Sequence, residues 1–266
     1  MIGCGNMGGA LLSRWLVADA VPRAGVRVCV ADETAAEQVR RHHGVACGTD
    51  LAAAVAEADV VVVAVKPQQR TQVLQAALAA RPEPPGPLWI SILAAVRVEQ
   101  LQQALGDQAR ISRWMPNTPV AVGRGVVAWS GSAALTQADL LRQDRLLAPL
   151  GLTLALPEAQ IDAFTAVAGC GPAYVFALCE ALQLAGQNAG LEPTQAAALA
   201  RQTIIGAAWQ LDGDPRPAHQ LREAVTSKGG MTESALRQLQ ASGWSEAMTA
   251  AVRAAVQRAA ELTVDS

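Results

Sequence analysis

The residues whose spacing most clearly indicates chemistry stand at the start of the chain. It opens MIGCGNMG, a GxGxxG motif, and a helical stretch, Gly9–Leu16, follows. In such a loop the first glycine makes a tight turn, the second lets the backbone approach a pyrophosphate, and the third allows close packing of helix and strand. The candidate dinucleotide contacts are Gly3, Gly5, Asn6, Met7 and Gly8.

An acidic residue follows the next expected strand, Val26–Ala31. This residue is Asp32, and a carboxylate at this position can accept hydrogen bonds from the adenosine ribose hydroxyls. Its charge would repel a ribose phosphate, which favours NADH over NADPH. Arg40 and Arg41 lie too far along the next helix to offset it. We therefore expect NADH or NADPH as the cofactor, with a preference for NADH.

Four further segments complete a recognisable pattern. They are AVKP at 64–67, RWMPNTP at 113–119, GCGPAY at 169–174 and VTSKGGMT at 225–232. In the last segment, Ser227 and the amides of Gly229 and Gly230 precede a helix expected over Thr232–Leu239. A hydroxyl and backbone amides at a helix start can cradle a carboxylate.

In order and spacing, these segments and the glycine loop resemble the pyrroline-5-carboxylate reductase family, from Ile2 to about Ala260. The resemblance implies a Rossmann domain followed by a helical dimerisation domain. It implies reduction of 1-pyrroline-5-carboxylate to L-proline by NAD(P)H, the last step of proline biosynthesis. It places cofactor contacts on the glycine loop and on Ala64, Val65, Lys66 and Pro67. It places substrate contacts on Ser227, Gly229 and Gly230, to which we add Asn117, and it makes Thr232 the residue that hydrogen-bonds the imine nitrogen.

The chemistry of the residues agrees with this assignment. A protonated imine is already a good electrophile, so hydride transfer to it needs orientation more than an acid–base pair. One hydroxyl near the ring nitrogen can hold and polarise it, and Thr232 can supply that hydroxyl. Trp114 and Tyr174 are expected to pack rather than to act on a ligand.

Some positions depart from the family pattern. Ala95 stands where glycine is common, and Leu51 where an asparagine often helps to hold the cofactor ribose. Neither departure removes Thr232 or a motif glycine.

The pattern of apolar residues predicts how these loops are positioned. Four apolar runs read as buried parallel strands and alternate with helical stretches, which indicates a doubly wound α/β domain over residues 1–156. The helix expected over Tyr174–Ala189 is apolar almost all round and must be covered on nearly every side. We therefore expect residues 157–266 to form an all-helical domain completed by a second subunit, in a homodimer or an oligomer of dimers. The expected strands are Val26–Ala31, Val60–Val65, Leu88–Leu93 and Gly125–Ser130.

The first strand of the sheet is unusually short. Only Met1 and Ile2 precede the glycine loop, whereas a first Rossmann strand runs about five residues in the centre of the sheet. We expect the coding sequence to continue upstream with about five residues of alternating apolar character.

Composition argues against several other classes of protein. The 266 residues carry a formal net charge of −2, which gives no basic footprint for nucleic acid or an anionic membrane. The longest apolar run, Val60–Val65, is too short to span a bilayer, and no secretory leader opens the chain, so we expect a cytoplasmic protein. The five cysteines and three histidines lack CxxC and HExxH spacing, so we expect no metal site.

Two alternatives remain open from the sequence. A 3-hydroxyacid dehydrogenase of the 6-phosphogluconate type shares the GxGxMG start and the helical second half, but it would need a catalytic lysine early in that half, and residues 151–227 contain none. A non-catalytic relative could bind dinucleotide and regulate a partner. Oxidation of NADH with pyrroline-5-carboxylate would separate both from the reductase.

Overall fold

The computed structural model describes residues 1–81 and 86–264. Backbone contacts divide the chain into two units. The first contains Met1–Cys170 and the residues from Ala255 onward, and the second contains Gly171–Ala254. The predicted class, an α/β Rossmann-like domain followed by a helical domain, is confirmed. The domain boundary between residues 156 and 157 stays a prediction.

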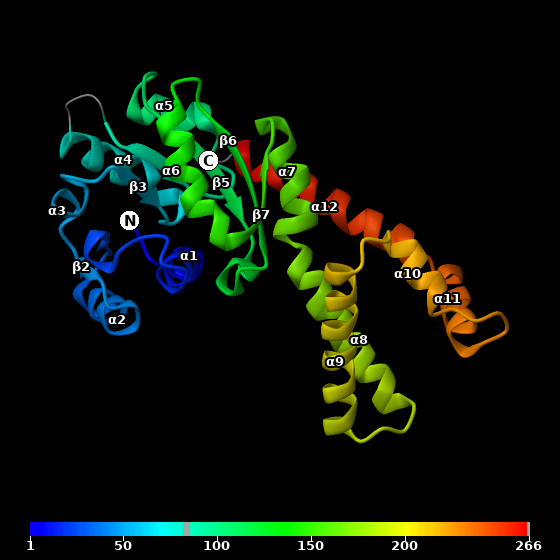
Figure 1. The fold of residues 1–266 in the computed structure, drawn as a ribbon. Coiled ribbons are helices and arrows are strands. Elements are labelled where there is room, and N and C mark those ends of the chain that lie inside the picture. Colours follow the sequence, from blue (N-terminus) through cyan, green and yellow to red (C-terminus); the bar gives the residue numbers. More distant parts are fainter. Residues whose placement is uncertain (82–85, 265–266) are drawn as a thin grey trace. The chain divides into compact units, whose positions relative to one another are not determined.

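A mostly parallel sheet forms the centre of the first unit (Figure 1). One edge is a pair of parallel strands, β1 (Arg27–Cys29) and β2 (Ala46–Gly48). Ile2 is bridged in parallel to Cys29 on one side and to Val63 on the other, so it joins this pair to the remaining strands. These follow in the order β3 (Val60–Val63), β4 (Leu88–Ser91), β5 (Ile111–Pro116), β6 (Gly125–Gly131) and β7 (Gly151–Ala155).

The sheet differs from the predicted one in two respects. The strands β2, β5 and β7 were not predicted, and β5 contains the first four residues of the RWMPNTP segment, which β6 follows. The expected parallel direction is wrong for β6, which runs antiparallel to β5, while β7 is parallel to β6. The connection Asn117–Arg124 is too short for the crossover that a parallel neighbour requires.

Helices cover both faces of the sheet. On one face α1 (Asn6–Val17) and α6 (Gln137–Leu147) pack on β3, β4 and β5. There Trp15 and Trp114 meet edge to face, with ring centroids 6.4 Å apart, and Trp114 is fully buried, which confirms its packing role. The opposite face carries α3 (Leu51–Val55), α4 (Arg70–Ala79) and α5 (Val98–Leu105), and α2 (Glu33–His43) belongs with β1 and β2.

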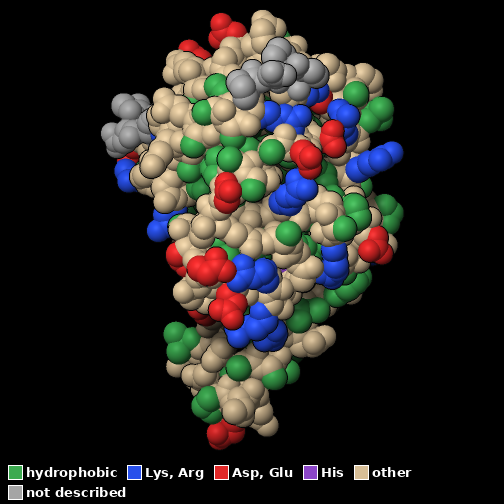
Figure 2. Space-filling view, turned by 90° about the vertical axis from the view of Figure 1, so that its left-hand side faces the viewer, with side chains coloured by type: hydrophobic (Ala, Val, Ile, Leu, Met, Phe, Trp, Pro, Cys, Tyr) green, Lys and Arg blue, Asp and Glu red, His purple; other side chains and the backbone are tan. Residues whose placement is uncertain are grey.

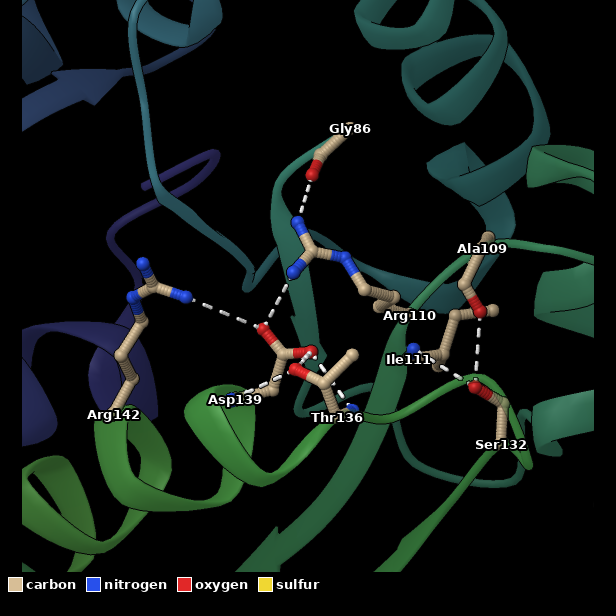
Figure 3. A network of polar contacts seen from close by, with 8 residues as sticks. All are labelled: Gly86, Ala109, Arg110, Ile111, Ser132, Thr136, Asp139 and Arg142. Carbon is tan, nitrogen blue, oxygen red and sulfur yellow. Dashed lines mark hydrogen bonds and ion pairs between the residues drawn. The ribbon is translucent and has the colours of Figure 1, made fainter. Parts of the chain in front are cut away.

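A buried polar network ties α6 to the sheet (Figure 3). The Asp139 side chain is fully buried, and its Oδ1 lies 2.8 Å from Arg110 Nη1. Its Oδ2 accepts hydrogen bonds from the Thr136 amide at 3.0 Å and the Thr136 hydroxyl at 2.6 Å, as in a capping box at the start of α6. Arg110 also donates to the carbonyl of Gly86. Every oxygen of this buried carboxylate therefore has a partner.

The second unit is helical. A short helix, α7 (Ile161–Phe164), and a π-helical turn, Thr165–Gly169, end the first unit. The helices α8 (Gly171–Asn188) and α9 (Pro193–Gly213) then lie side by side (Figure 1), so close that a Cβ on Gly186 would lie 3.3 Å from the Cβ of Ala196. The remaining helices are α10 (Ala218–Ala224), α11 (Met231–Ala241) and α12 (Trp244–Val264), of which α12 belongs to the second unit only as far as Ala254.

The helix α8 exposes most of its apolar side chains within one chain. None of its residues is buried, and Phe176 is 63% exposed. The helical stretch Glu158–Asn188 is also long and apolar enough, by length and composition, to cross a membrane. The expectation that no segment could do so was based on apolar runs and is corrected on this point. A core helix of a soluble assembly passes the same test.

Candidate active site

The glycine loop adopts the geometry that a dinucleotide requires. Gly3 has φ +82°, and a Cβ at this position would lie 2.6 Å from the carbonyl oxygen of Ala64, so only glycine fits. A Cβ at Gly8 would lie 3.0 Å from the Cβ of Ala64, which explains the third glycine of the motif. The loop and the residue after β3 are therefore packed backbone to backbone.

The start of α1 is open toward a ligand. Gly5 is the N-cap of α1, and a Cβ placed on it would meet no atom within 4 Å among the described residues. The first amides of α1, from Asn6 onward, have no acceptor within the helix. An anion can approach these amides, and a pyrophosphate fits this site.

The AVKP segment lies beside the glycine loop, as the prediction required. The Ala64 amide donates to the Ile2 carbonyl at 2.8 Å, directly after β3. Lys66 is exposed and precedes a single helical turn, Pro67–Gln69. The structure thus brings together two segments that are far apart in the sequence.

The acidic residue after β1 caps a helix. Asp32 is the N-cap of α2, and its Oδ1 accepts from the Ala35 amide at 2.8 Å. Arg40, on the same helix, lies 2.6 Å from Glu33 Oε1 and donates to the Cys47 carbonyl at 2.8 Å. The Glu33 hydrogen bond raises the pKa of Arg40. Arg40 is therefore held by partners within the chain. Figure 2 shows basic and acidic side chains interspersed on this side of the first unit.

The TSKGGMT loop of the second unit is tightly folded. Gly229 has φ +73°, and a Cβ on Gly230 would lie 2.4 Å from Ser227 Oγ. The Gly229 amide donates to Glu233 Oε2 at 2.7 Å, and the Gly230 amide donates to the Ser227 carbonyl at 3.0 Å. The amides expected to cradle a carboxylate are thus occupied by the chain's own acceptors.

Thr232 is differently placed. It is the second residue of α11 and is exposed. Over residues 1–81 and 86–264, no hydrogen-bond partner is recorded for its hydroxyl. A hydroxyl on the first turn of an exposed helix can donate to a ligand without breaking an existing bond.

The Asn117 side chain is hydrogen-bonded at both ends of its amide. It is buried, its Nδ2 donates to the Ala168 carbonyl at 2.9 Å, and its Oδ1 accepts from the Val126 amide at 2.8 Å. Nearby, Arg113 is buried in β5 and lies 2.8 Å from Glu158 Oε1. Both contacts fix the end of β5 against the segment around α7.

The comparisons place the chain among known proteins. Residues 158–262 match a family model for pyrroline-5-carboxylate reductase dimerisation, and residues 1–95 match one for NADP oxidoreductases, coenzyme F420-dependent. A pyrroline-5-carboxylate reductase of Pseudomonas aeruginosa is 41% identical over 98% of this chain and 95% of the relative. The chain belongs to the pyrroline-5-carboxylate reductase family.

Other family members agree over nearly the full length. A pyrroline-5-carboxylate reductase of Mycobacterium tuberculosis is 36% identical over 99% of this chain and 96% of its own. The solved reductase of Coxiella burnetii superposes with a TM-score of 0.91 at 32% identity, covering 98% of this chain and 97% of that one. The Plasmodium falciparum enzyme, solved with NADP bound, gives 0.87 at 26% identity, covering 98% and 96%. The family resemblance seen in the motifs is confirmed.

Two contacts of these segments were not predicted from the sequence. Glu233 reaches back to the Gly229 amide, and its place three residues after the N-cap Gly230 is the signal that could have revealed this bond. Glu158 partners Arg113, and no local spacing indicates a pair so far apart in the chain. The roles of the individual site residues stay predictions.

Proposed function

We propose that this chain reduces 1-pyrroline-5-carboxylate to L-proline with NAD(P)H, the last step of proline biosynthesis. The observation that carries the proposal is the glycine loop, closed to any side chain at Gly3 and open at Gly5, in a chain related over its full length to reductases of that name. The bound reduced nicotinamide supplies the hydride.

We assign the cofactor to the carboxyl end of the sheet. The amides at the start of α1, with Gly3, Gly5, Asn6, Met7 and Gly8, would hold the pyrophosphate. Asp32 would face the adenosine ribose, and Ala64, Val65, Lys66 and Pro67 would border the nicotinamide half. Arg40 is paired with Glu33, and Arg41 lies in the last turn of α2 while Asp32 is the N-cap of that helix, so we place neither guanidinium at the adenosine ribose, which favours NADH.

We assign the substrate to the loop before α11. Thr232 would donate a hydrogen bond to the imine nitrogen and so orient the ring. Ser227, Gly229 and Gly230 would surround the substrate carboxylate. Because the Gly229 amide is bonded to Glu233, a carboxylate that used this amide would have to displace Glu233. The unpaired first amides of α11 are available without that exchange.

Asn117 is assigned a weaker role than the sequence suggested. Its Nδ2 already bonds the Ala168 carbonyl and its Oδ1 the Val126 amide, and the side chain is buried, so these two bonds hold the amide in place. We propose that Asn117 positions the end of β5 and that substrate contact by its side chain is secondary.

We propose that the chain forms a homodimer through its helical unit. The exposed apolar side chains of α8 and α9, among them Phe176 and Trp209, lie within the residues that match the dimerisation model. Burying such side chains against a second copy explains the membrane-like composition of Glu158–Asn188. A cytoplasmic location stays a prediction.

The test of the proposed chemistry is a series at Thr232. Thr232→Ala should lower kcat about tenfold to a thousandfold, the range for one hydrogen bond that strengthens in the transition state. Thr232→Ser keeps the hydroxyl and should retain most activity, whereas Thr232→Val keeps the shape and should lose it. Binding of NADH, measured by fluorescence, should be unchanged throughout.

A matched control is Thr249→Val on α12, where the hydroxyl donates to the Ser245 carbonyl at 2.9 Å. This substitution should leave kcat unchanged. If Thr232→Val were as active as the wild type, Thr232 would be only a helix-start residue, and the assignment would be wrong.

A further inference from the structure

A proline follows the π-helical turn Thr165–Gly169, where the helical stretch Glu158–Asn188 departs from α-helical geometry. In a continuous α-helix the amide of residue 172 would donate to the carbonyl of residue 168. Pro172 has no amide hydrogen, and in an α-helix its ring would clash with the Ala168 carbonyl. The chain therefore needs another donor for this carbonyl.

The Asn117 side chain provides that donor. Its Nδ2 donates to the Ala168 carbonyl at 2.9 Å. In the part of the chain that the structure describes, no backbone amide is recorded as a donor to the same carbonyl. Asn117 is 7% exposed, so solvent has little access to the place of its amide. Loss of this donor would leave a partly buried carbonyl without a partner.

The other end of the Asn117 amide fixes its orientation. Its Oδ1 accepts from the Val126 amide at 2.8 Å, and the Asn117 backbone amide donates to the Val126 carbonyl at 3.2 Å. A backbone amide can only donate and a carbonyl can only accept, so the side-chain amide fits in one orientation. Asparagine meets both requirements, whereas aspartate lacks the donor and leucine lacks both groups.

Asn117 stands at the edge of the sheet to which we assign the cofactor. It directly follows β5, which is parallel to β4, and β4 is parallel to β3, so the carboxyl ends of these strands share one edge. The same strand holds the other end of the helical segment, because Arg113 lies 2.8 Å from Glu158 Oε1. Arg113 and Asn117 thus fix the segment from Glu158 to Gly169 to the sheet.

We propose that Asn117 is a positioning residue for hydride transfer, because its side chain replaces the amide that Pro172 lacks and fixes the Thr165–Gly169 turn to the sheet. The inference rests on the proposed function, which assigns the cofactor to the first unit and the imine to the second. The chain passes from the first unit to the second at Cys170–Gly171, directly after this turn. A turn held in one conformation limits the orientations that the reacting groups can adopt, and hydride transfer depends on that orientation. Binding of NADH uses the first unit alone and does not depend on it.

The proposal is tested with a double-mutant cycle in the full-length protein. Asn117→Asp keeps the size of the side chain and the acceptor for the Val126 amide, but it removes the donor to Ala168. We expect kcat to fall about tenfold, the effect of leaving one carbonyl unsatisfied, while the Kd for NADH, measured by fluorescence, stays unchanged. Pro172→Ala restores a backbone amide at residue 172. In the double variant kcat should therefore be about threefold or more higher than in Asn117→Asp alone.

Pro193→Ala is the matched control, because Pro193 also lies in the first turn of a helix, α9. Combined with Asn117→Asp, it should give no increase in kcat. Four results would each overturn the proposal. They are an unchanged kcat in Asn117→Asp, a parallel loss of NADH binding, no gain in the double variant with Pro172→Ala, and an equal gain from Pro193→Ala.

Amide exchange gives a second measurement that does not depend on catalysis. The Cys170 amide donates to the Thr165 carbonyl at 2.8 Å within the turn. We expect its exchange, followed by NMR without substrate, to be about tenfold faster in Asn117→Asp. An unchanged rate would overturn the proposal, also where Pro172→Ala fails to fold. Wild-type protein that forms no proline would instead refute the proposed function and leave this measurement valid.

Discussion

Replacing Arg110 by methionine should destabilise the protein by about 3 kcal/mol, because it leaves the buried Asp139 carboxylate without its main counter-charge (Figure 3). Arg110 Nη1 lies 2.8 Å from Asp139 Oδ1. Arg142 Nη1 lies 3.6 Å from Asp139 Oδ1, and the Arg142 side chain is 44% exposed. Solvent therefore screens the attraction between these two charges, and Arg142 does not replace Arg110. The bond from Arg110 to the Gly86 carbonyl is lost as well.

The coupling between the two residues can be measured with a double-mutant cycle. Asp139→Asn keeps the shape but weakens the cap on Thr136, and should cost about 2 kcal/mol. The double variant should be more stable than the sum of the single effects predicts by about 1.5 kcal/mol or more. The assay is urea unfolding at one fixed protein concentration, because dimerisation makes stability depend on concentration.

Two results would refute this reasoning. Arg142→Met is the control and should change stability by less than about 0.5 kcal/mol. A cycle that is additive within about 0.5 kcal/mol, or an Arg142 effect as large as that of Arg110, would show that the buried pair is not the stabilising contact.

The same carboxylate predicts a pH dependence. Burial alone would raise the pKa of Asp139, but the hydrogen bonds from Thr136 and the charge of Arg110 outweigh it, and the pKa is lowered. A lowered folded-state pKa gives stability that is complete above the unfolded-state pKa, about 3.9, and is lost as pH falls through the folded value. The stability difference between wild type and Asp139→Asn should therefore be constant near neutrality and shrink below about pH 4.

Three further predictions follow from single positions. Ala95 has φ +59°, a strained conformation for alanine, so Ala95→Gly should raise the free energy of unfolding by about 0.5–1 kcal/mol. The control Ala104→Gly, within α5, should lower it. If urea unfolding showed no increase in stability for Ala95→Gly, the backbone at Ala95 would not be strained. Leu178→Glu on α8 should give monomer or unfolded protein in sedimentation, and a folded, stable dimer would argue against the proposed interface. Asp32→Ser should raise the ratio of kcat/KM for NADPH over NADH about fivefold, and an unchanged ratio would remove Asp32 from cofactor selection.

The alternation of strands and helices in the first half was predictable because its core strands are uninterrupted apolar runs. Val60–Val63 and Leu88–Ser91 are of this kind. The strand β5 was missed because it buries Ser112 and Arg113, and a charged residue breaks an apolar pattern. Arg113 is tolerated there because Glu158, distant in the sequence, pairs with it. With β5 missed, the short connection to β6 and its antiparallel direction could not be recognised.

The candidate site was predictable where backbone conformation dictates the residue. Gly3 is required because a Cβ would collide with the Ala64 carbonyl, whereas a Cβ on Gly230 would meet the Ser227 hydroxyl. Hydrogen-bond partners were less predictable. Asn117 has the side chain of a ligand contact, yet both ends of its amide bond the backbone, which only the three-dimensional arrangement reveals.

The measurement that tests the central claim most directly is the stoichiometry of the reaction. Purified protein is mixed with pyrroline-5-carboxylate and NADH or NADPH, and both the oxidised nicotinamide and the L-proline formed are quantified. The proposed function predicts equal amounts of both, and loss of both in Thr232→Val. Dinucleotide binding without any proline formed would contradict it and would favour a non-catalytic, regulatory member of the family.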